Sequence, residues 1–370
     1  MKQLAILALG LLTPAMQEPG AVRLQHPTGK LTETFTFAGS IRELPDGRVL
    51  ISDRRENRVV VADFGQASVQ AVGRVGQGPG EYEEASPIYA LGGDSSIMAE
   101  FRRRWFILRR EKIIATLAPF EAAAAAVGNE VIIGTDGRGA VLSRKRPAVP
   151  SGSSATAAAD SVWIVRVAIA SGRVDTVARV RDARITTVQI RNDKGQVTSF
   201  TQSLANPYDI QEPVAACSDG WLAIVRLDPY RVDWRSPSGS LVRGAQSPVA
   251  EAERLTSAEK DAFMARQARF SSNKAQRADI YPEWPSHIPA VEERNRFTAM
   301  CSADGKAVVH RARSIAHPEA RYDIFDRRGS RVRQVSLAEN EFIIGFGSRT
   351  VYSVLVDDDG AEHIRRYAWN

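Results

Sequence analysis

The residues that usually hold metal ions are scarce in this chain, which has two cysteines and five histidines among 370 residues. Neither cysteine has the close Cys or His neighbour of a zinc site, and no two histidines have the i, i+4 spacing of a helical metal motif. The sequence also lacks a G-x-S-x-G elbow and a P-loop. We therefore predict no resident cofactor, no metal ligand and no catalytic residue.

Long apolar runs are absent too, apart from one at the N-terminus. No later segment approaches the roughly 20 residues of a membrane span. The composition, 44% hydrophobic and 25% charged, is that of a folded globular protein. The formal net charge is +6, but the arginines are scattered along the chain. We expect no nucleic-acid partner, and the charge favours solubility and attraction to anionic envelope polymers.

The N-terminus has the pattern of a secretory signal. Lys2 precedes a short apolar run over residues 4–12, and the small residues Thr13 and Ala15 stand at cleavage-site spacing. We predict a signal peptide over residues 1–15, a linker over 16–30 and a periplasmic or secreted protein. The alternative is an apolar first strand or helix of the fold. No cysteine stands at the cleavage point, so a lipid anchor is not expected.

Turns built from aspartate and glycine recur along the chain and mark a repeat of about 40 residues. Asp and Gly adopt the positive φ values that tight hairpins need, and apolar, β-branched runs flank each pair. These pairs stand at residues 46–47, 93–94, 136–137, 219–220, 304–305 and 359–360. A repeat of this length, with alternating strands and turns, is typical of one four-stranded propeller blade.

The repeats predict an all-β fold, a single six-bladed β-propeller over residues 31–370. Blades are expected near residues 40–82, 85–122, 125–181, 208–248, 295–337 and 338–370. The strand around residues 34–37 would complete the last blade, which closes the ring and removes exposed sheet edges. A β-sandwich is the structural alternative, but these strands exceed what one sandwich needs. We expect a monomer.

Two stretches interrupt the repeat. Residues 145–160 are small and flexible, which predicts a long hairpin loop in the third blade. Residues 249–294 form an insertion between blades four and five, with one helix that begins where Thr256 and Glu259 have capping-box spacing. The aromatic part of this insertion supplies three candidates for a lid over a ligand site at the channel mouth: Tyr281, Trp284 and His287. The alternative is a surface excursion that packs its own aromatic residues.

The first repeat carries a family resemblance. Asp46-Gly47, the strand ending at Asp53 and the turn through Asn57-Arg58 are similar to an NHL-type repeat. The exit at residues 76–82, Gly-Gln-Gly-Pro-Gly-Glu-Tyr, resembles the signature of secreted bacterial six-bladed β-propeller proteins related to NHL repeats. The last two blades also look like those of this family. Because its members are mostly uncharacterised, the resemblance implies fold and export rather than an activity.

The signature residues have structural interpretations. Asp53 and Arg58 can pair across a polar turn, where Asn57 tolerates the left-handed conformation. In the exit, glycine supplies unusual φ values, proline stiffens the crossing between blades, and Glu81 can accept backbone N–H groups. The predicted structural signature is Asp53, Asn57, Arg58, Gly76, Gly78, Pro79, Gly80 and Glu81.

Two classes of function stay open. The first, which we favour, is an exported non-catalytic binding or scaffold module for a protein, peptide or glycan. The second is a metal-dependent, lactonase-like hydrolase with a divalent metal in the central channel. It needs carboxylates that project from several blades to one point. Asp53, Glu100 and Asp228 lie near inner-strand ends and could serve, although turn and edge roles explain them equally well.

The two cysteines occupy equivalent places in two repeats. Cys217 and Cys301 each lie just before an Asp-Gly turn. Equivalent positions in neighbouring repeats often exceed the Cα separation of about 7 Å that a disulfide tolerates. We therefore expect two buried thiols, although an oxidising compartment would permit a bridge.

Overall fold

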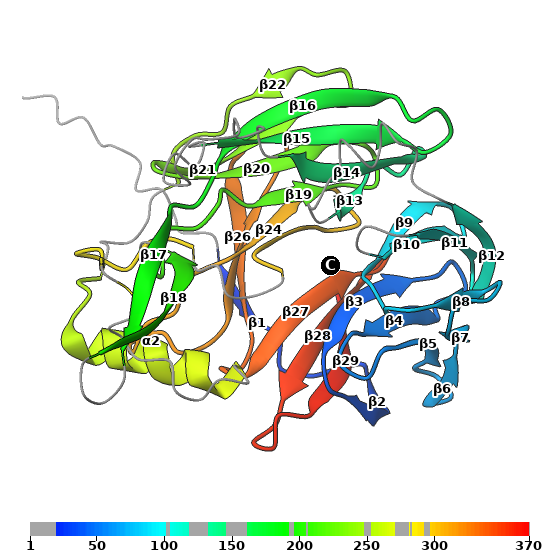
Figure 1. The fold of residues 1–370 in the computed structure, drawn as a ribbon, viewed down its shortest axis with the longest axis horizontal. Coiled ribbons are helices and arrows are strands. Elements are labelled where there is room, and N and C mark those ends of the chain that lie inside the picture. Colours follow the sequence, from blue (N-terminus) through cyan, green and yellow to red (C-terminus); the bar gives the residue numbers. More distant parts are fainter. Residues whose placement is uncertain are drawn as a thin grey trace, which may run out of the picture.

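Six sheets stand in a ring and form a β-propeller, as the sequence predicts (Figure 1). Each has four antiparallel strands, and one of them gains a fifth, parallel strand. The computed structural model of the chain describes residues 20–100, 104–117, 132–145, 161–191, 196–204, 206–247, 253–270, 281, 283–291 and 297–369. The predicted signal peptide at residues 1–15 and most of the hairpin loop at 145–160 lie outside these residues.

In the first three blades the chain runs outward from the innermost strand. Blade I contains β3 (Ala38–Glu43), β4 (Val49–Asp53), β5 (Arg58–Asp63) and β6 (Ser68–Ala71). A short parallel pair follows, β7 (Arg74–Val75) and β8 (Glu81–Tyr82). Blade II contains β9 (Ile88–Gly92), β10 (Ser95–Ala99), β11 (Trp105–Arg109) and β12 (Lys112–Leu117). Blade III contains β13 (Ile132–Thr135), β14 (Ala140–Lys145), β15 (Ser161–Ala168) and β16 (Val174–Arg181).

The same order continues in blades IV to VI, where both ends of the chain take part. Blade IV contains β19 (Val214–Ala216), β20 (Leu222–Leu227), β21 (Tyr230–Arg235) and β22 (Leu241–Val242). Blade V contains β23 (Ala299–Cys301), β24 (Ala307–His310), β25 (Arg321–Phe325) and β26 (Arg331–Ser336). Blade VI contains β27 (Glu341–Phe346), β28 (Thr350–Val356), β29 (Glu362–Ala368) and, as its outermost strand, β2 (Gly29–Phe35). The N-terminal strand therefore closes the ring, as the sequence predicts.

The central strands of each blade are buried on both faces because a neighbouring blade packs against each face. All five residues of β4 are buried, and so are Val59 to Ala62 in β5. Such strands read as continuous apolar runs rather than as alternating patterns, because neither face meets water. The core is consequently distributed among several apolar clusters between the blades instead of forming one central mass.

One face of the ring carries the extra segments, and we call it the crossing face. There each outer strand crosses to the next inner strand. Between blades III and IV the crossing contains a hairpin that the sequence did not predict, formed by β17 (Ile185–Arg191) and β18 (Val197–Leu204). Between blades IV and V it contains the predicted helix, α2 (Ser257–Phe270). Figure 1 shows the hairpin and α2 on the same side of the ring.

Helix α2 begins at the predicted cap. The amide of Glu259 donates to Thr256 Oγ1 at 3.2 Å, which satisfies one free N–H of the first turn. The carboxylate of Glu259 does not return to Thr256; both of its oxygens accept from the amide of Ile315 in blade V, at 2.9 and 3.2 Å. Phe263 and Met264 of the helix are buried. The insertion is therefore fixed to blade V by Glu259 as well as by its apolar face.

The segment that the sequence interprets as a linker, residues 16–30, contains ordered strands. β1 (Ala21–Arg23) pairs in parallel with β26 and adds a fifth strand to blade V. β2 begins at Gly29, two residues before the predicted domain boundary. Within the described part of the chain, no helix has the length and apolar character that a membrane crossing requires.

The expectation of two buried thiols is wrong. Cys217 and Cys301 form a disulfide, with Cα atoms 5.2 Å apart. Cys217 directly follows β19 and Cys301 ends β23, and these two strands are the innermost of blades IV and V. Blades converge toward the axis of the ring, so equivalent positions on inner strands come within the range that a disulfide needs.

Candidate ligand-binding groove

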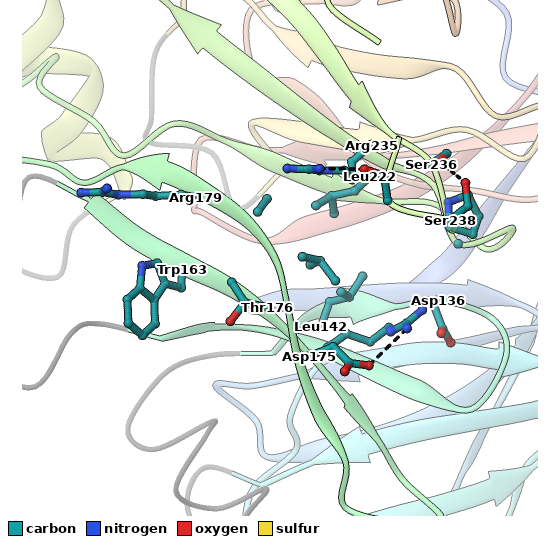
Figure 2. Close-up of a pocket in the computed structure, with 16 residues that line it drawn as sticks. Asp136, Leu142, Trp163, Asp175, Thr176, Arg179, Leu222, Arg235, Ser236 and Ser238 are labelled. Carbon is teal, nitrogen blue, oxygen red and sulfur yellow. Dashed lines mark hydrogen bonds and ion pairs between the residues drawn. The ribbon is translucent and has the colours of Figure 1, made fainter. Parts of the chain in front are cut away.

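A groove of about 540 Å³ opens between blades III and IV (Figure 2). Its floor is apolar: Leu142 on β14, Ala178 on β16 and Leu222 on β20 are all nearly buried there. A volume of this size lies within the range of about 300–1,000 Å³ that is typical of small-molecule sites. The groove lies between the facing sheets of blades III and IV and is lined by residues of both.

The blade III wall carries charges that are already paired. Asp175 receives Arg173 Nη2 at 2.8 Å and Arg166 Nη2 at 3.3 Å. These hydrogen bonds, that of Arg173 foremost, hold the pKa of Asp175 below its ordinary value although desolvation opposes them. Asp136 closes its own turn, accepting the amides of Arg138 at 2.8 Å and Ala140 at 3.0 Å. Both carboxylates are therefore engaged within their own blade.

The blade IV wall contributes polar side chains from the strand β21 and the turn after it. Arg235 Nη1 donates to the carbonyl of Gly239 at 2.7 Å, whereas its Nε is buried and has no hydrogen-bond partner among the described residues. Ser236 and Ser238 share a hydroxyl–hydroxyl contact of 2.8 Å on the same turn. Figure 2 shows Arg235 above Leu222, with the two serines at one end of the groove. This wall offers one guanidinium and two hydroxyls above an aliphatic floor.

Trp163 lies at the edge of this groove rather than on its floor. It is paired with Arg179 across β15 and β16, whereas the floor residue Ala178 is paired with Ile164. Successive side chains of a strand point to opposite faces, so Trp163 and Arg179 project from the other face of blade III. Trp163 is 39% exposed.

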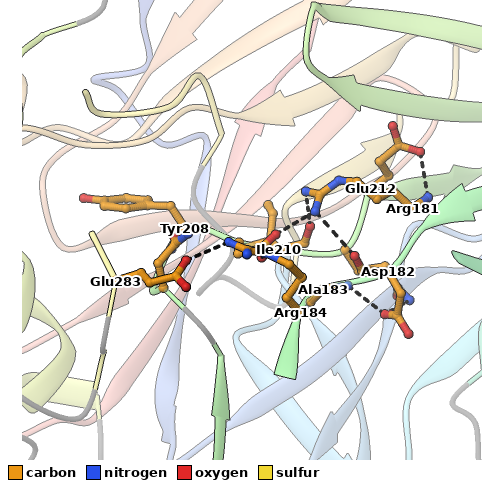
Figure 3. A network of polar contacts seen from close by, with 11 residues as sticks. Arg181, Asp182, Ala183, Arg184, Tyr208, Ile210, Glu212 and Glu283 are labelled. Carbon is orange, nitrogen blue, oxygen red and sulfur yellow. Dashed lines mark hydrogen bonds and ion pairs between the residues drawn. The ribbon is translucent and has the colours of Figure 1, made fainter. Parts of the chain in front are cut away.

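A polar network holds the crossing between the same two blades (Figure 3). Asp209 is almost buried and accepts Arg181 Nη1 at 2.6 Å and Arg184 Nε at 2.5 Å. Arg184 continues to Glu283 of the insertion at 2.9 Å. Its hydrogen bonds to Asp209 and Glu283 raise the pKa of Arg184. The network therefore ties the insertion to the crossing from blade III to blade IV.

The network extends into blade IV through alternating charges. Glu212 accepts the amide of Arg181 at 3.0 Å and Arg226 Nη1 at 2.5 Å. Asp233 receives Arg226 Nε and Arg231 Nε, each at 2.9 Å. Burial alone would raise the pKa of Asp233, but the hydrogen bonds from the two arginines outweigh it and lower that pKa. Such a satisfied network rigidifies the junction that forms the groove.

Asn57 and Arg58 of the first predicted turn make contacts that hold the neighbouring loops and strands. Asn57 has φ 53° and its side chain bridges the exit loop, donating to Glu83 O at 2.9 Å and accepting from the amide of Ala85 at 2.7 Å. Asp53 and Arg58 lie opposite each other in the β4–β5 pair, and the side chain of Arg58 forms ion pairs with Glu33 and, at 2.8 Å, with Glu56.

The buried carboxylate of Asp53 instead serves the backbone of two loops. It accepts four amides, at 2.8 to 3.2 Å. Their donors are Thr36, Phe37, Arg55 and Glu56.

The glycine-rich exit is organised by Glu81. Its Oε2 accepts the amide of Gly78 at 2.9 Å, and Arg74 Nε donates to Oε1 at 2.5 Å. A Cβ at Gly76 would lie 2.1 Å from Oε2 of Glu81, so only glycine fits there without a shift. Gly80 has φ 74°, and Pro79 is exposed beside it.

The three lid candidates do not form one group. Tyr281 is buried and its ring meets Trp284 edge-on at 5.7 Å. Trp284 also meets Phe263 of α2 at 5.9 Å and Tyr208 of the crossing at 6.5 Å. His287 is exposed, forms a bridge with Arg254 and contacts Ser286 Oγ through Nδ1 at 2.9 Å. Tyr281 and Trp284 thus belong to an aromatic cluster inside the insertion, and His287 lies apart from it.

The carboxylates considered for a channel metal are not brought together. Glu100 accepts the amides of Glu83 at 2.5 Å and Glu84 at 3.2 Å, and pairs with Arg104. Asp228 is exposed on the turn between β20 and β21. Within the residues that the structure describes, no three His, Cys, Asp or Glu side chains gather as a metal-ion site would require.

No protein-family profile matches this sequence, and no curated protein matches it. Similar solved structures include a member of the DUF4221 family from Bacteroides vulgatus, with 8% identity, 93% of this chain and 98% of that chain covered, and a TM-score of 0.49. A candidate exported protein of Bacteroides fragilis has 13% identity over 95% of this chain and 99% of its own, with a TM-score of 0.48.

The calcium-binding protein regucalcin from Agrobacterium tumefaciens has 10% identity over 95% of this chain and 97% of its own, with a TM-score of 0.39. At these scores the similarities carry no argument about function. The six-bladed ring is established by the strand order of this chain itself.

Sequence reasoning missed the groove. Its residues come from segments near 136–142, 166–179 and 220–239, and each segment is an ordinary strand or turn on its own. No local motif marks them, because the groove is created only when two blades pack face to face.

Proposed function

We propose that this chain is an exported, non-catalytic binding module that takes a glycan unit in the groove between blades III and IV. The observation that carries the proposal is the groove itself, a concave site of about 540 Å³ with an apolar floor and the side chain of Arg235 on its wall.

The shape and chemistry of the groove favour a sugar over a protein surface. A stable protein interface buries about 800 Å² on each partner, whereas a narrow groove suits a small ligand. A sugar ring has hydroxyl groups at its edge and C–H groups on its faces. Arg235, Ser236 and Ser238 can serve the edge, while Leu142 and Leu222 can cover a face.

A binding role agrees with the state of the buried carboxylates. Asp53 and Glu100 accept backbone amides, and Glu341 accepts Tyr367 Oη at 2.7 Å and Ser353 Oγ at 2.6 Å. Groups that hold the fold together in this way are poorly suited to act as a base or a metal ligand. The proposal accordingly includes no resident cofactor and no nucleic-acid partner.

Export and the relation to NHL repeats are part of the same proposal. The disulfide suits an oxidising compartment such as the periplasm or the medium. The signature in the first blade supports a relation to the secreted propellers with NHL-like repeats. A monomer is proposed because the ring closes on itself through β2 and β29.

The test is a glycan array probed with the wild-type protein and two tryptophan variants. Ser238→Trp fills the mouth of the groove from an exposed position. Ser330→Trp places the same ring on the corresponding exposed turn of blade V and is the matched control. We expect the wild type and Ser330→Trp to bind the same glycans and Ser238→Trp to lose them.

A second variant tests the chemistry of the wall. Arg235→Gln keeps hydrogen-bonding capacity but removes the charge, and we expect it to weaken binding about tenfold or more, as for a charge-assisted hydrogen bond. Binding that survives unchanged in Ser238→Trp, or a wild type that binds no glycan, would contradict the proposed function.

A further inference from the structure

A row of three side chains crosses blade III beside the groove. Lys145 on β14 is the register partner of Trp163 on β15, and Trp163 is in turn the partner of Arg179 on β16. Directly opposed residues of antiparallel strands have their side chains on the same face of the sheet, with Cβ atoms about 4.5–5.5 Å apart. The indole of Trp163 is therefore flanked by one cation on each side. We call these three residues the tryptophan row.

The fold leaves Trp163 open to solvent. It is 39% exposed, whereas the other five tryptophans of the chain are buried or half-buried. Among the residues that the structure describes, no aromatic ring packs against it. Covering an aromatic face is favourable, so this indole is a surface on which the apolar face of a ligand can pack.

The two cations of the row have no counter-charge in the described part of the chain. Arg179 Nε donates to Ser161 Oγ at 2.6 Å, which orients the guanidinium without neutralising it. Neither Lys145 nor Arg179 is in an ion pair with any described residue. The carboxylate of Asp175, on the same strand as Arg179, is already held by two other arginines of blade III. The row therefore presents two positive charges on either side of an apolar ring.

The tryptophan row adjoins the groove. Trp163 and Arg179 both line its edge, and β16 is the outermost strand of blade III. Ala178 lies on the floor of the groove, and the next residue, Arg179, turns to the other face of the same strand. Figure 2 shows Trp163 and Arg179 at the end of the groove opposite Ser236 and Ser238. A ligand that leaves the groove at this end passes over the edge of β16 and meets the row.

We propose that the ligand of the groove is an acidic oligosaccharide, whose second sugar unit stacks on Trp163 and directs an anionic group, a carboxylate or a sulfate, to Arg179 or Lys145. This inference rests on the proposed function and names the class of glycan. The C–H face of a sugar ring suits the indole, and its anionic group forms charge-assisted hydrogen bonds with a guanidinium or an ammonium.

Other ligands use the row less completely. A neutral glycan can cover the indole but leaves both cations without a partner. A single-stranded nucleic acid also combines rings with negative charge, but it stacks successive bases on a series of aromatic side chains. The row has one indole and no second aromatic residue. An acidic sugar uses the ring and the charges together.

The experiment uses a glycan array that carries uronate, sialate and sulfated oligosaccharides beside neutral oligosaccharides of the same length and linkage. We expect the wild type to bind acidic chains of two or more units about tenfold more tightly than their neutral counterparts. This preference should shrink at high ionic strength, because the charges lie at the surface. A short oligodeoxythymidylate is included as the nucleic-acid probe and should not bind.

Variants of the row test each part of the proposal. Trp163→Ala should weaken binding of the preferred oligosaccharide roughly fivefold to tenfold, and Trp163→Phe, which keeps a ring, should retain most of it. Arg179→Gln should reduce the preference for acidic over neutral chains. Ile114→Ala and Arg328→Gln change an exposed apolar residue and an exposed arginine of other blades, and these matched controls should bind like the wild type. Trp163 and Arg179 are both exposed, and circular dichroism checks that the variants fold.

The outcomes distinguish this inference from the proposed function. If the wild type binds glycans and Ser238→Trp loses them, the proposed function stands. Within that result, equal affinity for acidic and neutral chains, or unchanged binding in both Trp163→Ala and Arg179→Gln, would overturn the inference. Oligonucleotide binding that Trp163→Ala abolishes would overturn it as well, because the row would then serve a nucleic acid. A wild type that binds no glycan would overturn both.

Discussion

Cys217 and Cys301 are bonded to each other across the innermost strands of two neighbouring blades, although 84 residues separate them in the chain. The whole insertion with α2 lies within the loop that this disulfide closes. The bond therefore keeps blades IV and V together near the axis, independently of how the insertion folds.

Removing the disulfide should lower stability substantially. A double change, Cys217→Ala with Cys301→Ala, restores the entropy of a long loop in the unfolded chain, and we expect a loss of about 2–5 kcal/mol. Denaturant unfolding measures it. A reducing agent should lower the Tm of the wild type and leave that of the double variant unchanged; an unaffected wild type would show that the bond contributes little.

The N-terminal strand should decide whether the ring closes. A chain that starts at Thr28 loses β1 but keeps β2, and we expect it to fold with a slightly lower Tm. A chain that starts at Thr36 also loses the buried Leu31 and Phe35 and exposes the edge of β29, so we expect unfolding or aggregation. Circular dichroism and size-exclusion chromatography distinguish the two. Equal behaviour of both chains would mean that β2 is dispensable.

His310 should make stability depend on pH. It is fully buried against Tyr322 and Phe342, and burial, assisted by the charges of Arg313 and Arg321, lowers its pKa to about 3. Below its ordinary pKa of about 6.5 the unfolded chain takes up a proton that the native state refuses. The free energy of unfolding should therefore fall as the pH decreases from about 6.5 toward 3, by at most about 1.4 kcal/mol per pH unit from this residue.

His310→Phe keeps a ring of similar shape and should reduce that slope. The measurement is denaturant unfolding at several pH values between neutrality and pH 4. His287→Gln, at an exposed position, is the control and should keep the slope of the wild type. A slope that is the same in His310→Phe and the wild type would assign the pH dependence to other groups.

Metal analysis separates the binding proposal from the hydrolase alternative. The mature protein, purified without chelator, should contain less than one calcium, zinc or manganese ion per chain by inductively coupled plasma mass spectrometry. EDTA should leave its Tm unchanged. One tightly bound divalent ion per chain, with a Tm that EDTA lowers, would favour the lactonase-like alternative and justify a screen of lactone substrates.

Trp284 should stabilise the insertion rather than the propeller. Its ring contacts Tyr208, Phe263 and Tyr281, so Trp284→Ala removes the centre of the aromatic cluster and should cost the insertion about 2 kcal/mol or more. Limited proteolysis should cut the insertion faster while the propeller core persists. If glycan binding in the groove also falls, Trp284 gains a role in that site.

The features of this fold that could be predicted from the sequence are those set by residues close together in the chain. The Asp-Gly turns, the apolar runs between them and the spacing of about 40 residues are properties of neighbouring residues, and they predicted six blades, the closing strand and the insertion with its helix. The cap at Thr256 was predictable for the same reason. The hairpin of β17 and β18 was not, because it adds one more strand pair to a crossing that has no propeller period.

The groove could not be predicted from the sequence, whereas the backbone conformations of single turn residues could. The positive φ values of Asn57 and Gly80 are local backbone properties, so these conformations follow from residue type. The groove depends on contacts between two blades, and the position of α2 depends on contacts between the insertion and blade V. Arg235 and Arg266 are ordinary arginines in the sequence, and only their surroundings distinguish them.

The sequence by itself determined the repeat, the turns and the class of fold, because period and turn chemistry act over short distances. The tertiary structure alone decided which distant groups meet: Cys217 with Cys301, Arg58 with Glu33, and Arg266 with the loop before Arg321. The physical reason is that blades converge at the axis and diverge at the rim. Convergence brings inner-strand residues into bonding distance, and divergence opens the groove between blades III and IV.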